Sequence, residues 1–269
     1  MKKLVAILVI LGLAGVANAA FFEDFEGYTA DAQLVGSGGW TDSGFGGWYR
    51  ANYPAWTRTP LGLGAGPNAG APGPGGPSTP WMGYAGRDVT GDATASGYTL
   101  EMLTGGVGPG NNGLIIGDNR LIGTGNADNV ANPADHIYIQ SNHAGYTYID
   151  AWDDGVNDST ELTPGGSPAG DMTGLGWYRV KWELDFSGTP SASAYIGDAD
   201  DTTGALLAGW TLLATKTLPD GLDTPAEVAA AGFHAHKTGF VDQFSSTPEP
   251  VTLSILALGA GLALLRRRR

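Results

Sequence analysis

The chain has 269 residues, a formal net charge of −13, 44 Gly, 16 Pro and no Cys. Without Cys, disulfide frameworks, zinc–thiolate sites, iron–sulfur clusters and cysteine nucleophiles are excluded. Gly and Pro make up about 22% of the residues, which disfavours a helix-rich fold and is typical of short strands joined by turns. Eight Trp, ten Tyr and eight Phe are too many for a disordered chain.

The N-terminus predicts a secretory signal peptide over residues 1–20. A basic start precedes an apolar run at residues 4–16, and an Ala-Asn-Ala sequence follows as a small-x-small cleavage site. We expect cleavage after Ala19 or Ala20 and export of the protein. The alternative is an ordinary buried N-terminal segment.

The C-terminus predicts a membrane anchor. Residues 251–265 carry no charge, and four arginines end the chain at 266–269. As a helix, this run reaches only about 22 Å, short of a hydrocarbon core of about 30 Å. It can span the membrane if the bilayer thins or the arginines snorkel. The arginines place this end in the cytoplasm.

The same segment, residues 248–269, resembles the PEP-CTERM sorting signal of Gram-negative bacteria. The matching residues are Pro248, Glu249 and Pro250 before the apolar run, and Arg266, Arg267, Arg268 and Arg269 after it. The resemblance implies that a membrane protease-transpeptidase, the exosortase, recognises the tripeptide and processes the anchor. The two prolines keep the motif extended and outside the helix, which suits a protease cleft. The alternative is a plain tail anchor.

The charge is concentrated in the part between the two targeting segments. Without the six basic residues and Glu249 of these segments, residues 21–247 keep 8 basic and 26 acidic residues, a net charge of −18. We expect no binding to nucleic acid or to an anionic membrane surface. Calcium binding and a merely well-solvated acidic exterior both remain open.

Residues 21–247 predict one all-β domain. Over residues 177–186, five apolar residues alternate with four charged ones, which indicates a strand with one buried face: Tyr178, Val180, Trp182, Leu184 and Phe186 against Arg179, Lys181, Glu183 and Asp185. Further strands are expected at 21–25, 48–53, 98–103, 113–116, 136–140, 146–152, 192–196, 210–218 and 239–244, separated by turn residues.

Two other segments stand out in this domain. Thr224, Pro225 and Glu227 form a capping-box pattern that predicts one short helix ending near Gly232. Residues 61–80 hold seven Gly and five Pro and are expected to form a long loop within the domain.

The order of motifs resembles concanavalin A-like jelly-roll domains, a family of lectins and glucanases. The motifs are FEDFEGY at 22–28, GGW at 38–40, WYRV at 177–180, YIG at 195–197 and FVDQF at 240–244. The resemblance implies an antiparallel β-sandwich whose first and last strands pair. It does not settle function, because one fold hosts many functions.

Catalysis has little support in the sequence. Glycosidases need two carboxylates flanking the scissile bond, and the glucanase pattern Glu-x-Asp-x-x-Glu is missing from the sequence. Glu183 and Asp185 have a suitable spacing, but they alternate with Arg179 and Lys181, as on a solvated face with cross-strand ion pairs. We therefore predict a protein that is not an enzyme, with a glucanase-like, glycan-active enzyme as the alternative.

Three candidate binding features remain. His234 and His236 have a spacing that metals can use, but polar-face or edge positions on a strand are the favoured interpretation. If the terminal strands pair, a structural calcium ion is expected between Asp24, Glu26 and Asp242, and acidic clusters at 150–158 and 198–201 are weaker candidates. Aromatic residues gather between positions 40 and 84, and we take the tryptophans Trp48, Trp56 and Trp81 as candidates for stacking on sugars, with loop packing as the alternative.

The sequence therefore predicts an exported, exosortase-sorted envelope or extracellular-matrix protein of a Gram-negative bacterium. Its jelly-roll β-sandwich is expected to be non-catalytic and a candidate for polysaccharide binding. Its C-terminal helix is expected to hold it at the inner membrane before processing.

Overall fold

The computed structural model describes residues 21–25, 28, 32–34, 36–42, 49–51, 71–72, 85–106, 111–121, 134–141, 147–162, 176–200, 203–236 and 239–248. The predicted signal peptide, the apolar run at 251–265 and most of the predicted loop at 61–80 lie outside these residues. Among the residues just given, no helix is long and apolar enough to cross a membrane.

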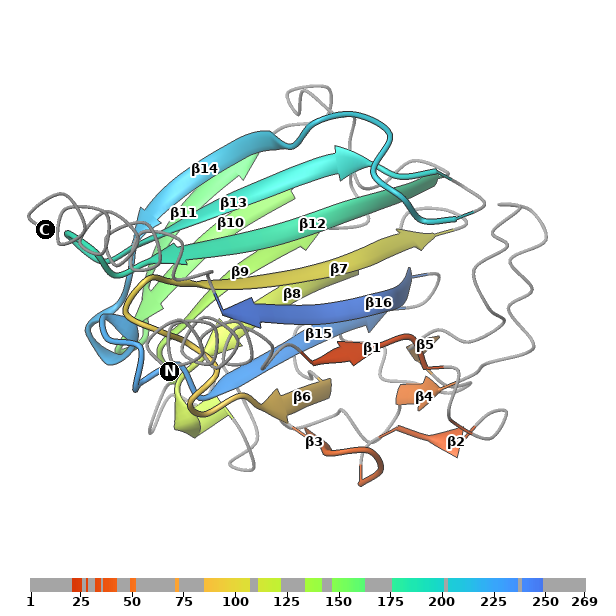
Figure 1. Ribbon diagram of the computed structural model, residues 1–269, viewed down its shortest axis with the longest axis horizontal. Helices are drawn as coiled ribbons and strands as arrows, with labels where there is room; N and C mark the ends of the chain where they lie inside the picture. The colour runs from red at the N-terminus through yellow and green to blue at the C-terminus, as the bar shows by residue number, and fades with distance from the viewer. Residues whose placement is uncertain are drawn as a thin grey trace, which may run out of the picture.

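Two antiparallel sheets face each other in the β-sandwich (Figure 1). The six-stranded sheet has the order β1 (Phe22–Glu23), β16 (Gly239–Pro248), β7 (Tyr98–Gly106), β12 (Gly176–Asp185), β13 (Ser191–Asp198) and β14 (Thr211–Thr217). The seven-stranded sheet has the order β11 (Val156–Leu162), β10 (Thr147–Asp153), β9 (His136–Ser141), β8 (Asn111–Gly117), β15 (Ala230–His236), β6 (Ala85–Asp88) and β3 (Trp40–Asp42). A small third sheet joins β2 (Ala32–Gln33), β4 (Tyr49–Ala51) and β5 (Ala71–Pro72). The predicted all-β jelly-roll sandwich is confirmed.

The core lies between the two large sheets and follows from alternation along their strands. On β12, Val180, Trp182 and Leu184 are buried in it, as the period-two pattern predicts. The indole Nε1 of Trp182 donates a hydrogen bond to the carbonyl of Leu114 on β8, 3.3 Å away. This bond links the centres of the two sheets, so the buried indole keeps a partner for its only polar atom.

The N-terminal strand is fastened to the last strand by aromatic packing. β1 pairs with β16 in antiparallel fashion, which confirms the predicted pairing of the first and last strands. Behind this pair, Phe25, Trp40, Phe233 and Phe244 pack together, with the Trp40 and Phe233 ring centroids 5.2 Å apart. Such ring contacts add to the burial of large apolar surfaces, and here they hold a sandwich that has no disulfide.

The predicted short helix after Thr224 is wrong. The capping contact forms, since the Thr224 amide donates to the Glu227 carboxylate at 3.0 Å, but the residues make only a turn. β15 begins at Ala230, where Ala231 and Phe233 pack into the core. Tertiary burial of this alternating segment outweighs the local helix signal. The helical turns that the structure does describe, η2 (Asn119–Leu121) and η3 (Asp220–Leu222), have three residues each.

The acidic stretch 150–158, a weak calcium candidate in the sequence, is a β-hairpin. Asp153 pairs with Val156 across a two-residue turn, Asp154-Gly155, with φ values of 46° and 84°. Positive φ at both positions is the requirement of a type I′ turn, which Asp-Gly satisfies well. The returning strand β11 is polar and lies at the sheet edge, and it is absent from the predicted strands.

Candidate functional site

The outer face of the six-stranded sheet carries a cluster of charged and aromatic side chains around β12. Since Val180 and Trp182 point into the core, Arg179, Lys181 and Glu183 lie on the opposite face of the strand. The register sets Lys181 opposite Glu101 on β7 and opposite Tyr195 on β13. We call this cluster the β12 face and define it by Glu101, Arg179, Lys181, Glu183, Ser193, Tyr195, Trp210 and Thr215.

Arg179 attaches the loop that follows β13 to the β12 face. Its guanidinium forms an ion pair with Glu101, donates to the side-chain oxygen of Gln243, and donates through Nε to the Gly204 carbonyl at 2.6 Å. Gln243 has φ of 46° at a bulge in β16 and donates in turn to the Thr203 carbonyl at 3.3 Å. These contacts hold the loop after β13 against the sheet, so Arg179 has a structural task.

Lys181 organises the open part of the β12 face. Its Nζ lies 2.5 Å from the Glu183 carboxylate, 4.6 Å from the centroid of the Tyr195 ring and 4.5 Å from the centroid of the Trp210 ring. A cation at these distances is attracted to both ring faces. The ammonium therefore fixes two aromatic rings and a carboxylate in one arrangement.

The rim of this arrangement is polar and reaches solvent. The Glu183 side chain is 37% exposed, and Tyr195 and Trp210 are half-buried. Burial, and then the neighbouring Glu183 carboxylate, raises the pKa of the Tyr195 hydroxyl, which therefore stays protonated at neutral pH. Rings beside carboxylate and hydroxyl groups can recognise a ligand that has apolar faces and many hydroxyls.

Hydroxyl groups extend the β12 face toward the sheet edge. Ser193 on β13 and Thr215 on β14 are cross-strand neighbours, and their hydroxyls share an exposed hydrogen bond of 3.0 Å. Asp185, the second carboxylate of the sequence pattern, is exposed and accepts a hydrogen bond from the Ser187 amide at 2.8 Å. Asp185 therefore caps a turn, and its hydrogen bonds with Ser187 lower the pKa of its carboxyl group.

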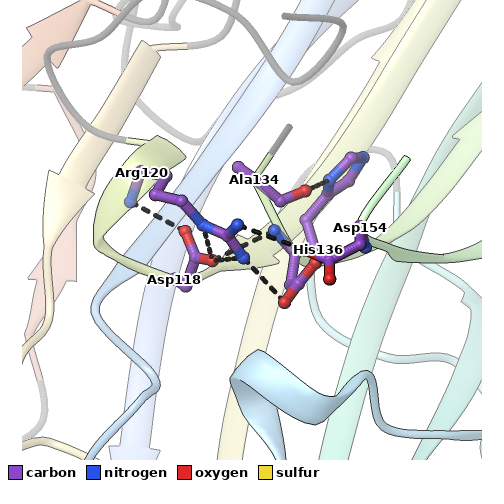
Figure 2. Close-up of polar contacts among 6 residues, drawn as sticks. Asp118, Arg120, Ala134, His136 and Asp154 are labelled. Carbon is purple, nitrogen blue, oxygen red and sulfur yellow. Dashed lines mark hydrogen bonds and ion pairs between the residues drawn. The ribbon is translucent and has the colours of Figure 1, made fainter. Parts of the chain in front are cut away.

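A second charged cluster lies at one end of the seven-stranded sheet (Figure 2). The Arg120 guanidinium contacts Asp118 at 2.6 Å, Asp135 at 2.7 Å and Asp154 at 3.4 Å. The side chains of Asp118 and Asp135 are only 9% and 4% exposed. Hydrogen bonding to Asp118 is the largest cause that raises the pKa of Arg120.

Backbone amides satisfy the remaining carboxylate oxygens of this cluster. Asp118 accepts hydrogen bonds from the amides of Arg120 at 2.7 Å and of Asp135 at 3.1 Å. Asp135 accepts one from the amide of Asp154 at 2.8 Å. The cluster thus joins η2, the start of β9 and the β10–β11 turn, and its contacts indicate a structural role.

His136 lies beside this cluster as a buried, neutral side chain. Its Nδ1 contacts the Ala134 carbonyl at 2.8 Å (Figure 2), and its ring stacks on Trp152 with a centroid distance of 5.7 Å. Burial lowers the pKa of His136 to about 4, although Asp118 acts in the opposite direction. Across the ranges that the structure describes, no three His, Asp or Glu side chains gather in an arrangement that could hold a metal ion.

The predicted calcium ligands are only partly within the described residues. Asp24 directly follows β1, Asp242 lies at the bulge within β16, and Glu26 lies outside the described residues. Asp242 is buried and accepts a hydrogen bond from the Gln243 amide at 2.8 Å. Calcium at this junction stays a prediction. In the other acidic cluster, Asp200 accepts hydrogen bonds from the Thr203 amide and hydroxyl, as a turn residue does.

The remaining predicted residues are placed as follows. Pro248 ends β16, whereas Glu249, Pro250 and the arginines Arg266, Arg267, Arg268 and Arg269 lie outside the described residues, as do Trp48, Trp56 and Trp81. His234 and His236 belong to β15. Tyr195 and Trp210 are partners of Lys181 that the sequence pattern does not reveal. Their only signal was an aromatic residue on each of two predicted strands, without the register that brings them together.

Comparison with known proteins gives a fold likeness and no sequence relative. No protein-family model matches the chain, and no curated protein matches it by sequence. Among solved structures, a β-glucanase of Bacillus licheniformis is 12% identical, with a TM-score of 0.38, and the match covers 86% of this chain and 98% of that one. A galectin of Caenorhabditis elegans is 13% identical over 64% of this chain and 91% of its own, with a TM-score of 0.36. An endo-β-1,4-glucuronan lyase of the fungus Trichoderma reesei is 8% identical over 85% and 94%, with a TM-score of 0.36. The strand order carries the fold assignment, and likenesses at these scores decide neither ligand nor activity.

Proposed function

We propose that the sandwich is a non-catalytic glycan-binding domain that contacts its ligand through the β12 face. The observation that carries this proposal is the arrangement around Lys181, which holds the rings of Tyr195 and Trp210 beside the Glu183 carboxylate. Ligand sites combine aromatic walls with a few fixed polar groups, and this face has both. The hydroxyls of Ser193 and Thr215 continue the polar surface beyond the rings.

The pairing of charges on the β12 face favours binding over hydrolysis. A glycosidase needs one carboxyl group that holds a proton and a second that is ionised. Glu183 is paired with Lys181, and Glu101 is paired with Arg179. Each of these two carboxylates is thus engaged by a cation within the sheet. Asp185, the partner that the enzyme alternative would use on the same strand, is engaged in a turn.

An array of neutral, acidic and amino-sugar glycans, with and without a calcium chelator, tests the binding proposal. We expect the full chain to bind at least one glycan class, and Trp210→Ala to lose that binding. Trp152→Ala is the matched control, because Trp152 is also half-buried but stacks on His136 in the other sheet. Loss of binding in the control and not in Trp210→Ala would overturn the assignment of the face. Release of shorter products from a bound glycan, followed by mass spectrometry, would support the enzyme alternative.

We further propose that the chain is exported through the inner membrane and sorted at the envelope by an exosortase-type enzyme. The support is in the sequence: a signal peptide at 1–20 and the motif Pro248-Glu249-Pro250 before an apolar run and an arginine tail. In mass spectra of the mature protein, we expect no peptide from residues 251–269. Glu249→Ala should leave unprocessed precursor in the inner membrane. An intact C-terminus on surface-located protein would contradict the proposal.

A further inference from the structure

The first residue after the predicted signal peptide contacts the last strand of the sandwich. The Phe21 carbonyl accepts a hydrogen bond from the Ser246 amide at 3.0 Å, and the rings of Phe21 and Phe244 lie 5.3 Å apart. The Arg87 guanidinium lies over the Phe21 ring, 4.5 Å from its centroid. Phe21 is therefore held by two elements, β16 and β6.

The end of β16 is held in the sheet up to the predicted sorting motif. Ser246 is fully buried, and its hydroxyl lies 3.5 Å from the Asp92 carboxylate. Thr247 and Pro248 pair with Thr99 and Tyr98 of β7. Pro248 is the last residue of the strand and the first of the motif, so no spacer separates the motif from the folded domain. Figure 1 shows β1 beside β16, with which it pairs at Phe244 and Ser245.

We infer that the contact of Phe21 with β16 is a clasp that withholds the C-terminal sorting motif from processing. The inference rests on the proposed sorting function. A processing enzyme binds an extended segment on both sides of its cut through the backbone N–H and C=O groups of that segment. Strand pairing within a sheet occupies the same N–H and C=O groups. Ser246, Thr247 and Pro248 use those groups within the sheet, so the enzyme must act on a chain in which this strand end is released.

The clasp also connects the two ends of the chain. Cleavage after Ala20 would make Phe21 the new N-terminus, and Phe21 is the residue whose carbonyl holds Ser246. A signal peptidase likewise needs an extended segment around its cut, which includes Phe21. The signal-peptide cut therefore acts before the clasp closes, and the cut at the sorting motif then requires the clasp to open.

The test is a pulse-chase of the full chain in cells that carry an exosortase. Phe21→Ala removes the ring that packs on Phe244, whereas Phe22→Ala on the same strand removes a ring that is 62% exposed and serves as the matched control. We expect Phe21→Ala to lose the C-terminal segment about tenfold faster than the wild type, and Phe22→Ala to match the wild type. Hydrogen exchange of the Ser246 amide should accelerate in Phe21→Ala alone, while the amides of β12 keep their protection.

A second variant keeps the test decisive if Phe21→Ala folds poorly. Insertion of Gly-Ser-Gly-Ser between Thr247 and Pro248 moves the motif away from the sheet without changing the core, and it should also accelerate processing. Equal or slower processing in the spacer variant would overturn the clasp. Retention of the C-terminal segment in the wild type and in every variant would instead overturn the sorting function on which the clasp rests.

Discussion

Two clusters in this sandwich combine a cation with carboxylates, and they differ in what surrounds them. In the Arg120 cluster, two nearly buried carboxylates receive backbone amides as well as the guanidinium. On the β12 face, the Glu183 carboxylate is partly exposed, and aromatic rings stand next to the cation that pairs with it. The first arrangement uses its hydrogen-bonding groups within the fold. The second leaves carboxylate, hydroxyl and ring surface at the solvent.

This difference separates a structural charge cluster from a candidate recognition surface. Buried charges are stable only when their partners are complete, so removal of one partner is costly. Exposed ion pairs contribute little to stability, so a partly exposed cluster can be changed at small cost and is free to serve a ligand. The comparison predicts large stability effects and small binding effects at the Arg120 cluster, and the reverse at the β12 face.

The largest expected effect is the loss of the Arg120 guanidinium. Arg120→Met leaves Asp118 and Asp135 as buried carboxylates without their cation, and the free energy of unfolding should fall by about 3–5 kcal/mol. Lys181→Met is the matched change on the β12 face. The Lys181 side chain is itself only 10% exposed, but the Glu183 side chain that it leaves unpaired is 37% exposed, so the loss should be smaller than for Arg120→Met. Urea denaturation measures both. Equal losses would remove the distinction between the two clusters.

The pH dependence of stability tests the burial of His136. The folded pKa is about 4 and the ordinary value is 6.5, so the unfolded state binds the proton first as the pH falls. The contribution of neutral His136 to the free energy of unfolding is fully present above pH 6.5. It decreases by about 3 kcal/mol as the pH falls from 6.5 to 4. His136→Asn keeps a donor near the Nδ1 position but does not titrate, so its stability should decrease less over that range. Identical pH profiles from thermal unfolding would show that His136 is not buried as a neutral group.

At Glu183 we expect a substitution to change glycan affinity and to leave stability nearly unchanged. Glu183→Gln keeps the size of the side chain and removes the charge, so affinity for the bound glycan should fall about tenfold, or about 1.4 kcal/mol. The free energy of unfolding should change by less than about 1 kcal/mol. Asp185→Asn, two residues further along β12, should bind like the wild type, since Asp185 caps a turn. Isothermal titration calorimetry distinguishes the two variants.

The smallest expected effect is at the hairpin turn next to the Arg120 cluster. Gly155 has φ of 84°, where a side chain is disfavoured, so Gly155→Ala should reduce stability by about 1 kcal/mol. Glycan affinity should not change, because this turn belongs to the seven-stranded sheet. A loss of affinity in this variant would indicate that the glycan contacts the β10–β11 turn and not the β12 face.

Local pattern predicted the fold better than it predicted the site. The alternation around Trp182 identified β12 and its buried face, since one strand alone carries that information. It also identified Arg179, Lys181 and Glu183 as outward residues, and the expected cross-strand ion pair is present between Arg179 and Glu101.

Register and tertiary burial explain what the sequence did not reveal. Tyr195 and Trp210 reach Lys181 only through the pairing of β12 with β13 and the course of the following loop, which no local signal specifies. β11 was missed because an exposed edge strand lacks apolar alternation, although Asp154-Gly155 is a hairpin signal. The helix after Thr224 was wrong because burial of Ala231 and Phe233 decided the conformation.

The central claim is that the glycan lies on the β12 face, and hydrogen–deuterium exchange with and without the best glycan of the array tests it most directly. We predict slower exchange in β12, β13 and the segment that contains Trp210 when the glycan is added, with no change in η2 and the β10–β11 turn. Protection confined to the Arg120 cluster or the seven-stranded sheet would contradict the account, as would the absence of any protection at saturating glycan.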